Sequence, residues 1–338
     1  TNPEAPLARY VDLAGGTSTG SIIAGALALG MSGTDIHQLY TELAGRVFRR
    51  SMTRLPGVQS RFRPTELKAQ LQAVFGDRRL ESDDLLTGFA LVTKRLDTGS
   101  PWIVSNNSGA PYWADPADGS YLGNRHYRLA DLIRASTAAP YYFAPEEIAI
   151  AEGEPPGLFV DGGVSPHNNP AMALLQLVGV PALGFGWPMG MDKLRIISIG
   201  TGSHRPRLNA AAARRMPAAG LAVNALTGLM SDSEAQTLTL MHLLGQTPTP
   251  WKLNSEVGDL GGYTLTPKPL FGFLRYDVRL EADWLQAELG LSLPEKEIIR
   301  LRQLDDASTL PLLYEIGQIA AEKFVRPQHL AGMTARPA

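Results

Sequence analysis

The sequence predicts an α/β protein in three layers, with a central, mostly parallel sheet and a helical C-terminal layer. Short apolar segments of strand length alternate with segments of helical periodicity as far as residue 205. This alternation is typical of a sheet that carries helices on its faces. Beyond residue 209 the pattern is mostly helical, and no repeat or linker separates this part. We therefore expect a single domain over residues 1–338, with an α/β core at 1–205 and a mainly helical part at 206–338.

Short apolar runs predict the strands. The first run, at residues 10–14, has the length and composition of a buried strand. The following runs of the core cover residues 89–94, 102–105, 158–160 and 195–199, and two later strands are expected at 262–266 and 273–280.

Helical periodicity and capping residues place the helices. Thr34 is a suitable N-cap, Gly76 and Pro140 end the helices before them, and Asn169-Pro170 begins a new helix. The expected helices cover residues 22–29, 34–49, 64–75, 129–138, a segment from 168 onward, 210–229, 232–244, 283–289, 295–304 and 310–325.

The composition excludes several classes of protein. Hydrophobic residues make up 44% of the 338 residues and the net charge is −2, which describes a globular protein without the basic face that nucleic-acid binding requires. The absence of cysteine excludes disulfides, a thiol nucleophile and cysteine-bound metals. No acidic loop has calcium-binding spacing, so we expect neither metal nor cofactor. The most apolar stretch, 171–191, is interrupted by Gln176, Pro181 and four glycines, which predicts a buried helix and loop rather than a membrane span.

The segment Gly16-Thr17-Ser18-Thr19-Gly20 has the form G-x-S-x-G and lies between a predicted strand and a predicted helix. This is the setting of a nucleophile elbow, a strained turn that exposes a serine hydroxyl. Gly16 and Gly20 suit such a turn because strand and helix are expected to approach too closely there for a Cβ atom. The pentapeptide alone also fits a plain glycine-rich corner or an anion-binding loop, although the spacings of the P-loop and of G-x-G-x-x-G are absent.

A second candidate follows the predicted strand at 158–160. Asp161 stands at the carboxyl end of that strand and is followed by Gly162 and Gly163. The carboxyl ends of strands in open α/β sheets form the edge at which ligands bind, although an ordinary turn aspartate fits the same pattern. His167, six residues on, would nominally complete a Ser-His-Asp triad, but its place at the start of a helix favours a structural role.

Residues 49–63 combine five arginines with interleaved apolar side chains. The pattern fits a solvated loop, and it also fits a mobile lid whose apolar groups insert into a lipid surface while its guanidinium groups meet phosphates.

Taken in order, four motifs resemble the patatin-like phospholipases, the group of bacterial patatin-like proteins and plant patatins. They are Gly16-Thr17-Ser18-Thr19-Gly20, Ala135-Ser136-Thr137-Ala138-Ala139-Pro140-Tyr141-Tyr142-Phe143, Asp161-Gly162-Gly163 and Asn168-Asn169-Pro170. The strand at 196–199 and the segment 273–278 are also similar to the family, so the resemblance covers nearly the whole chain.

The resemblance implies a three-layer α/β/α lipid acyl hydrolase with a Ser-Asp dyad and no catalytic histidine. Ser18 would be the nucleophile and Asp161 its base, and the reaction would pass through an acyl-enzyme. Positions beside the substrate and the oxyanion would be Gly16, Thr19, Gly162 and Gly163. The implied partner is a phospholipid or another lipid ester, reached by transient contact with a membrane surface.

One family motif, the oxyanion loop D-G-G-G-x-R-G before the nucleophile strand, is absent from this sequence. The chain begins with Thr1 rather than Met, so we expect that residues preceding Thr1 were trimmed. The alternatives to a lipid hydrolase are a general Ser-His-Asp esterase and an inactive storage or scaffold protein. We expect a cytoplasmic or membrane-peripheral location, with secretion as an effector left open, and the sequence does not indicate the oligomeric state.

Overall fold

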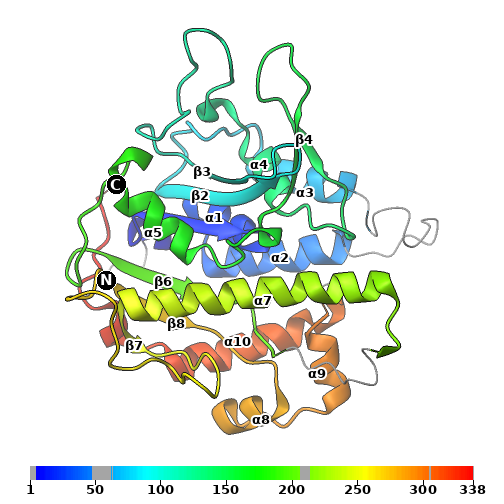
Figure 1. Cartoon of the computed structure of the whole chain (residues 1–338), viewed down its shortest axis with the longest axis vertical. Helices are drawn as coiled ribbons and strands as arrows, with labels where there is room; N and C mark the ends of the chain where they lie inside the picture. The colour runs from blue at the N-terminus through cyan, green and yellow to red at the C-terminus, as the bar shows by residue number, and fades with distance from the viewer. Residues whose placement is uncertain (1–4, 48–61, 63, 206–213, 304–305, 338) are drawn as a thin grey trace. The chain divides into compact units, whose positions relative to one another are not determined.

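The computed structural model describes residues 5–47, 62, 64–205, 214–303 and 306–337. The chain forms two compact units, one made of residues 1–187 with 333–338 and the other of residues 188–332. Figure 1 shows that both units contain strands and helices. The expectation that all 338 residues form a single domain stays a prediction.

The sheet of the first unit is mixed. It contains β1 (Leu13–Thr17), β2 (Gly88–Arg95), β3 (Pro101–Ser105), β4 (Glu146–Ile148) and β5 (Gly157–Asp161). β1 runs parallel to β2, whereas β3 and β5 run antiparallel to β2, and β4 runs antiparallel to β5. The α/β class is confirmed, but the sheet is not mostly parallel, because connections as short as the one between β2 and β3 join only antiparallel strands.

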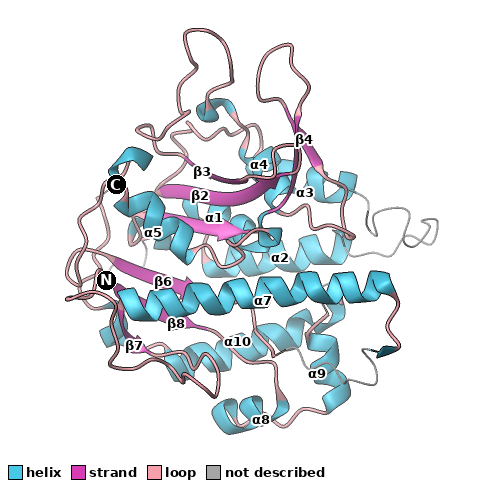
Figure 2. Ribbon diagram, viewed as in Figure 1, coloured by secondary structure: helices cyan, strands magenta, loops and turns pink. Residues whose placement is uncertain are grey.

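β1 and β5 meet end to end on one edge of β2. The other edge of β2 is paired with β3 over residues 90–94. β1 pairs with residues 88–92 of β2, and β5 pairs with residues 93–95. Because β1 is parallel and β5 antiparallel to β2, their carboxyl ends point toward each other. Figure 2 shows β2 and β3 side by side in this sheet.

Helices cover both faces of β1. α1 (Thr19–Ala28) and α4 (Leu129–Ser136) pack against each other and against β2. Neighbouring strand residues point to opposite faces, and a Cβ at Gly16 would lie 2.1 Å from the Gly20 backbone of α1. A Cβ at Gly15 would instead lie 2.6 Å from the Leu174 side chain of α5 (Ala171–Gly179). α1 and α5 therefore enclose the strand as the outer layers of a three-layer arrangement.

The hydrophobic core of the first unit lies where α1, α4 and α3 (Pro64–Phe75) converge on the sheet. α2 (Gly33–Val47) contributes buried residues to the same cluster. The largest side chains of this core are wholly or almost wholly buried and include Phe62, Phe75, Phe89, Leu132 and Phe159.

The second unit has a parallel sheet of its own. Its strands are β6 (Arg195–Ile199), β7 (Gln246–Thr249) and β8 (Gly272–Tyr276), in the order β6-β8-β7. Its helices are α7 (Ala218–Leu244), α8 (Ala282–Trp284), which continues as a π-helical turn to Leu289, α9 (Glu295–Leu301) and α10 (Leu310–Phe324). The predicted boundary at residue 205 assigned β6 to the first part of the chain, whereas β6 belongs to this second unit.

Two expected elements of this unit are wrong, and hydroxyl side chains explain both. From Ala218 onward, the predicted helices at 210–229 and 232–244 are one helix, α7, because Ser231 donates its hydroxyl to the carbonyl of Thr227 instead of capping a new helix. Residues 210–213 of the first predicted helix lie outside the described residues. The predicted strand at 262–266 is a loop, in which the Thr264 hydroxyl bonds both the N–H and the carbonyl of Thr266.

The two glycines of the G-x-S-x-G segment differ in what surrounds them. A Cβ at Gly20 would meet no atom within 4 Å, so the expectation that this glycine is needed for space is wrong. Of these two glycines, only Gly16 lies where a neighbouring backbone occupies the position of a Cβ.

We predict that Gly16→Ala destabilises the protein and that Gly20→Ala, its matched control, does not. The added methyl group at position 16 must push α1 away from β1, at a cost of about 1–3 kcal/mol. At position 20 the same change is made in a helix, where alanine is favoured over glycine by up to about 1 kcal/mol. Urea unfolding of both variants measures the difference, and equal stabilities would contradict the close approach.

Candidate active site

Ser18 stands at the junction of β1 and α1 in a strained conformation. Its backbone angles are φ 55° and ψ −128°, and a positive φ is uncommon for any residue other than glycine. Such a conformation costs on the order of 1–3 kcal/mol and persists only where the surrounding structure enforces it. The strand and the helix on either side of the turn supply that enforcement, as the sequence pattern predicted.

Asp161 reaches Ser18 because of the way β1 and β5 share an edge. Thr17, the last residue of β1, pairs with Val92 of β2, and Asp161, the last residue of β5, pairs with the next residue, Thr93. The residue that follows β1 and the residue that ends β5 are therefore close neighbours, although 143 positions separate them in the chain.

The two side chains are hydrogen-bonded. The Ser18 hydroxyl donates to Oδ2 of Asp161 at 2.5 Å, and the N–H of Gly163 donates to Oδ1 at 2.7 Å. Asp161 is only 5% exposed. Burial raises the pKa of Asp161 to about 6, although the hydrogen bonds from Ser18 and Gly163 act in the opposite direction. The carboxylate is thus a stronger base than a solvent-exposed aspartate while it stays ionised at neutral pH.

The end of α4 holds both backbones in place. The N–H of Ser18 donates to the hydroxyl of Ser136 at 2.9 Å, and that hydroxyl donates to the carbonyl of Val92 at 2.7 Å. Two residues later, the carbonyl of Ala138 accepts the N–H of Asp161 at 3.0 Å. Sequence analysis assigned no chemistry to this segment and missed Ser136, whose buried hydroxyl joins three elements that only the fold brings together.

The site residues expected beside the substrate have separate roles in the structure. Gly162 lies against β2, where a Cβ would be 2.3 Å from the carbonyl oxygen of Val92. Gly163 gives its N–H to Asp161, so this N–H is not directed at a substrate oxygen. Thr19 is the first residue of α1 and directly follows Ser18 in the chain.

His167 contributes its backbone to the elbow. Its carbonyl accepts the Thr17 hydroxyl at 2.7 Å, and its N–H donates to the Ser165 hydroxyl at 3.2 Å. Within the part of the chain that the structure describes, no hydrogen bond joins the imidazole to Ser18 or Asp161. Burial lowers the pKa of His167. These contacts fit the structural role that its sequence position favours.

Two features are absent from the described residues, with the gaps stated above. No group of three or more histidine, cysteine, aspartate or glutamate side chains there could hold a metal ion. No described helix is both long and apolar enough to cross a membrane. The basic-apolar lid expected at 49–63 lies outside the described residues except for Phe62, which is buried.

Comparison with known proteins identifies relatives of this chain. The family model described as patatin-like phospholipase matches residues 4–175, just over half of the chain. The chain is 31% identical over 197 residues to the cUMP-AMP-activated phospholipase of Escherichia coli, covering 58% of this chain and 56% of that protein. It is 26% identical to patatin-like protein 1 of Arabidopsis thaliana, covering 59% and 51% of the two chains.

A third relative is the cGAMP-activated phospholipase of Vibrio cholerae, which is 25% identical over 57% of this chain and 53% of its own length. The chain thus spans about half the length of the curated relatives that it matches.

We predict that Ser136→Ala lowers the reactivity of Ser18 about tenfold. The variant removes the hydroxyl that holds the Ser18 N–H against β2, and a hydrogen bond of this kind contributes about 0.5–1.5 kcal/mol. The rate at which a fluorophosphonate labels Ser18 measures the effect. Ser105→Ala is the matched control, because Ser105 is buried in β3 on the other edge of β2. An unchanged labelling rate in Ser136→Ala would contradict the positioning role.

Proposed function

This chain belongs to the patatin-like phospholipase family, and on that premise we propose that it is a serine lipid acyl hydrolase. It cleaves fatty-acyl esters of phospholipids or related lipids, with Ser18 as nucleophile and Asp161 as base. The observation that carries the proposal is the 2.5 Å hydrogen bond from the Ser18 hydroxyl to a buried carboxylate whose pKa is raised to about 6. A hydroxyl held against a base in this way is the arrangement that activates a weak nucleophile.

In the proposed first half-reaction, Oδ2 of Asp161 accepts the hydroxyl proton as Oγ of Ser18 forms a bond to the ester carbonyl carbon. The tetrahedral intermediate collapses when the bond to the alcohol oxygen breaks, and that oxygen takes the proton from Asp161. The products are the acyl ester of Ser18 and the lysolipid. In the second half-reaction, Asp161 accepts a proton from water, the water oxygen attacks the acyl carbon, and the proton returns to Ser18 as the fatty acid leaves.

The negative charge on the carbonyl oxygen needs hydrogen-bond donors, each of which contributes about 2.7–4 kcal/mol. The first turn of a helix has N–H groups without intrahelical partners, and α1 begins directly after Ser18. We assign the N–H of Thr19 as one donor. The N–H groups of Ser18 and Gly163 are not assigned, because both are bonded within the protein.

The contacts of Asp161 favour a dyad over a Ser-His-Asp triad. One carboxylate oxygen accepts the Ser18 hydroxyl directly, and the other accepts the N–H of Gly163. No place for an imidazole between serine and aspartate is left. His167, the histidine that the chain order suggested, is used through its carbonyl and N–H groups.

We predict that Ser18→Ala and Asp161→Asn each lower hydrolysis of phospholipid vesicles by about 10⁴-fold, in the range found for the members of other catalytic units. His167→Ala, the matched control, is expected to retain activity within about threefold, because its bonds to Thr17 and Ser165 are made by backbone atoms. Released fatty acid is the measured quantity. A loss in His167→Ala as large as that in Asp161→Asn would support the triad, and a wild-type chain that neither hydrolyses lipid nor accepts a fluorophosphonate at Ser18 would contradict the proposal.

We predict that kcat/KM for a neutral ester rises with pH up to about 6 and is constant above it. Asp161 acts as a base only when it is deprotonated, and its pKa is raised to about 6 by burial. Below that pH, the active fraction falls tenfold for each pH unit. A profile governed by a group near pH 3.8, the ordinary aspartate value, would contradict the assignment.

The raised pKa of Asp161 can also be tested without an activity assay, through the pH dependence of the stability of the folded chain. A raised pKa means that protonated Asp161 stabilises the folded state below pH 3.8 and that this stability is lost as the pH rises through 6. The difference corresponds to about 3 kcal/mol when the whole window is crossed. Asp161→Asn lacks this loss, so its stability relative to the wild type should increase between pH 4 and pH 8 in urea unfolding.

A further inference from the structure

The second unit contains a half-open cleft of about 840 Å³ that plays no part in the proposed reaction. All the residues that line it lie between 205 and 329, within the second unit. Its volume is in the range of clefts that bind small molecules, which is about 300–1,000 Å³. The composition of the lining indicates which class of small molecule fits.

Aromatic rings form one wall of the cleft. The rings of Trp251 and Trp284 are 6.3 Å apart between centroids, and Trp284 lies 6.1 Å from Phe324. Both tryptophans are partly exposed, and all three residues line the cleft. Three neighbouring rings that are not closed off from solvent provide a surface on which a flat aromatic group can pack.

The charge of the lining is positive. Its cations are twice as numerous as its anions, with Arg205, Lys252, Arg275, Arg279, Lys323 and Arg326 against Asp277, Asp283 and Glu288.

Particular carboxylates, in the lining and directly beside it, pair with these cations. Arg275 pairs with Asp277 and Glu234, and Lys323 pairs with Glu288. Arg205 pairs with Glu281 and lies 4.0 Å from Asp283. Among the described residues, Lys252 and Arg326 form no ion pair, and both are exposed. Arg279 likewise forms no ion pair there and donates to the carbonyl of Lys252. Lys252 and Arg326 are therefore available to an anion, whereas Arg279 is only 9% exposed and interacts electrostatically with Glu281, Asp277 and Asp283.

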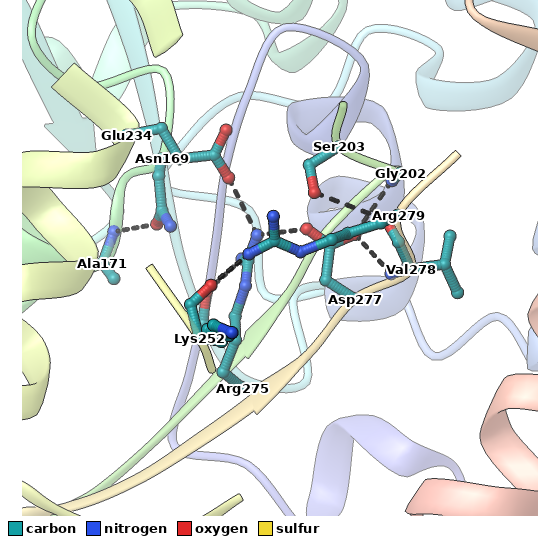
Figure 3. A network of polar contacts seen from close by, with 11 residues as sticks. Asn169, Ala171, Gly202, Ser203, Glu234, Lys252, Arg275, Asp277, Val278 and Arg279 are labelled. Atoms are coloured by element: carbon teal, nitrogen blue, oxygen red, sulfur yellow. Dashed lines mark hydrogen bonds and ion pairs between the residues drawn. The ribbon is translucent and has the colours of Figure 1, made fainter. Parts of the chain in front are cut away.

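A buried ion network supports this surface, and Figure 3 shows Arg275, Glu234, Asp277 and Gly202, which belong to it. Arg275 donates to Glu234 at 2.8 Å, to Asp277 at 2.6 Å and to Ser198 at 2.9 Å. Asp277 in turn accepts the N–H of Gly202 at 3.0 Å. Arg275 is 4% exposed, and its Nε has no hydrogen-bond partner.

The same network positions the aromatic wall. The guanidinium carbons of Arg275 and Arg279 lie 6.0 and 5.2 Å from the ring centre of Trp251. Cation–π contacts of this kind fix the tryptophan beside the positive groups. The cleft thus presents an aromatic surface and an excess of positive charge on a preformed frame.

We propose that this cleft binds a small organic phosphate that carries an aromatic ring, as a nucleotide does. The ring packs on the Trp251–Trp284–Phe324 wall, and the phosphate is bound by Lys252 and Arg326. A phosphate without a ring uses only the cations, and a nucleoside without a phosphate uses only the wall. The proposal does not depend on Ser18 or on the proposed hydrolase activity.

Calorimetric titration of the full chain carrying Ser18→Ala tests the proposal, because that variant cannot turn over an ester. The probes are AMP, inorganic phosphate, adenosine and glycerol 3-phosphate, the last standing for a lipid headgroup. We expect AMP to bind at least about tenfold more tightly than each of the other three, since aromatic stacking and charge each contribute at least that factor. Tryptophan fluorescence should change on addition of AMP.

Lys252→Gln combined with Arg326→Gln should weaken AMP binding at least about tenfold. Lys296→Gln is the matched control, because Lys296 is an exposed lysine of α9 that does not line the cleft, and it should leave binding unchanged. No AMP binding at millimolar concentration, equal binding of phosphate or glycerol 3-phosphate, or equal weakening by Lys296→Gln would each overturn the proposal.

Discussion

The shared edge of β2 is the constraint on which the candidate site depends. β1 arrives parallel to β2 and ends opposite Val92, and β5 arrives antiparallel and ends opposite Thr93. Because the two strands end at neighbouring positions on one edge, the Ser18 hydroxyl lies 2.5 Å from Oδ2 of Asp161. The end of α4 then joins both backbones to the same place through Ser136 and Ala138.

The burial of Asp161 makes its contact with Ser18 chemically useful, because burial changes the pKa of the carboxylate. Asp161 is enclosed by the strands and the end of α4, so water does not stabilise its charge, and its pKa is raised. A raised pKa makes the carboxylate a better base and also makes the folded state less stable at neutral pH. The strained backbone of Ser18 adds a second cost at the same point. The second unit also contains a buried charged group, Arg275. Unlike Asp161, Arg275 is paired with opposite charges, the carboxylates of Glu234 and Asp277.

Features decided by neighbouring residues could be predicted from the sequence. The strand, turn and helix around Ser18 are such a feature, and so are the strand that ends at Asp161 and the alternation that indicates an α/β protein. Errors arose where a local pattern had two physical solutions. A serine can cap a helix or bond back into it, as Ser231 does in α7, and alternating threonines can form a strand or bond to their own loop, as Thr264 does.

The sequence alone therefore determined which residues carry reactive groups and which local elements hold them. It did not determine the antiparallel direction of β5, the free space at Gly20 or the bond from Ser18 to Ser136 across 118 positions. These depend on pairings and close approaches between segments that are distant in the chain, and periodicity and capping rules report only on residues a few positions apart. Tertiary structure decided them, because a strand takes its direction and a buried hydroxyl its partner from whichever segment the fold places beside it.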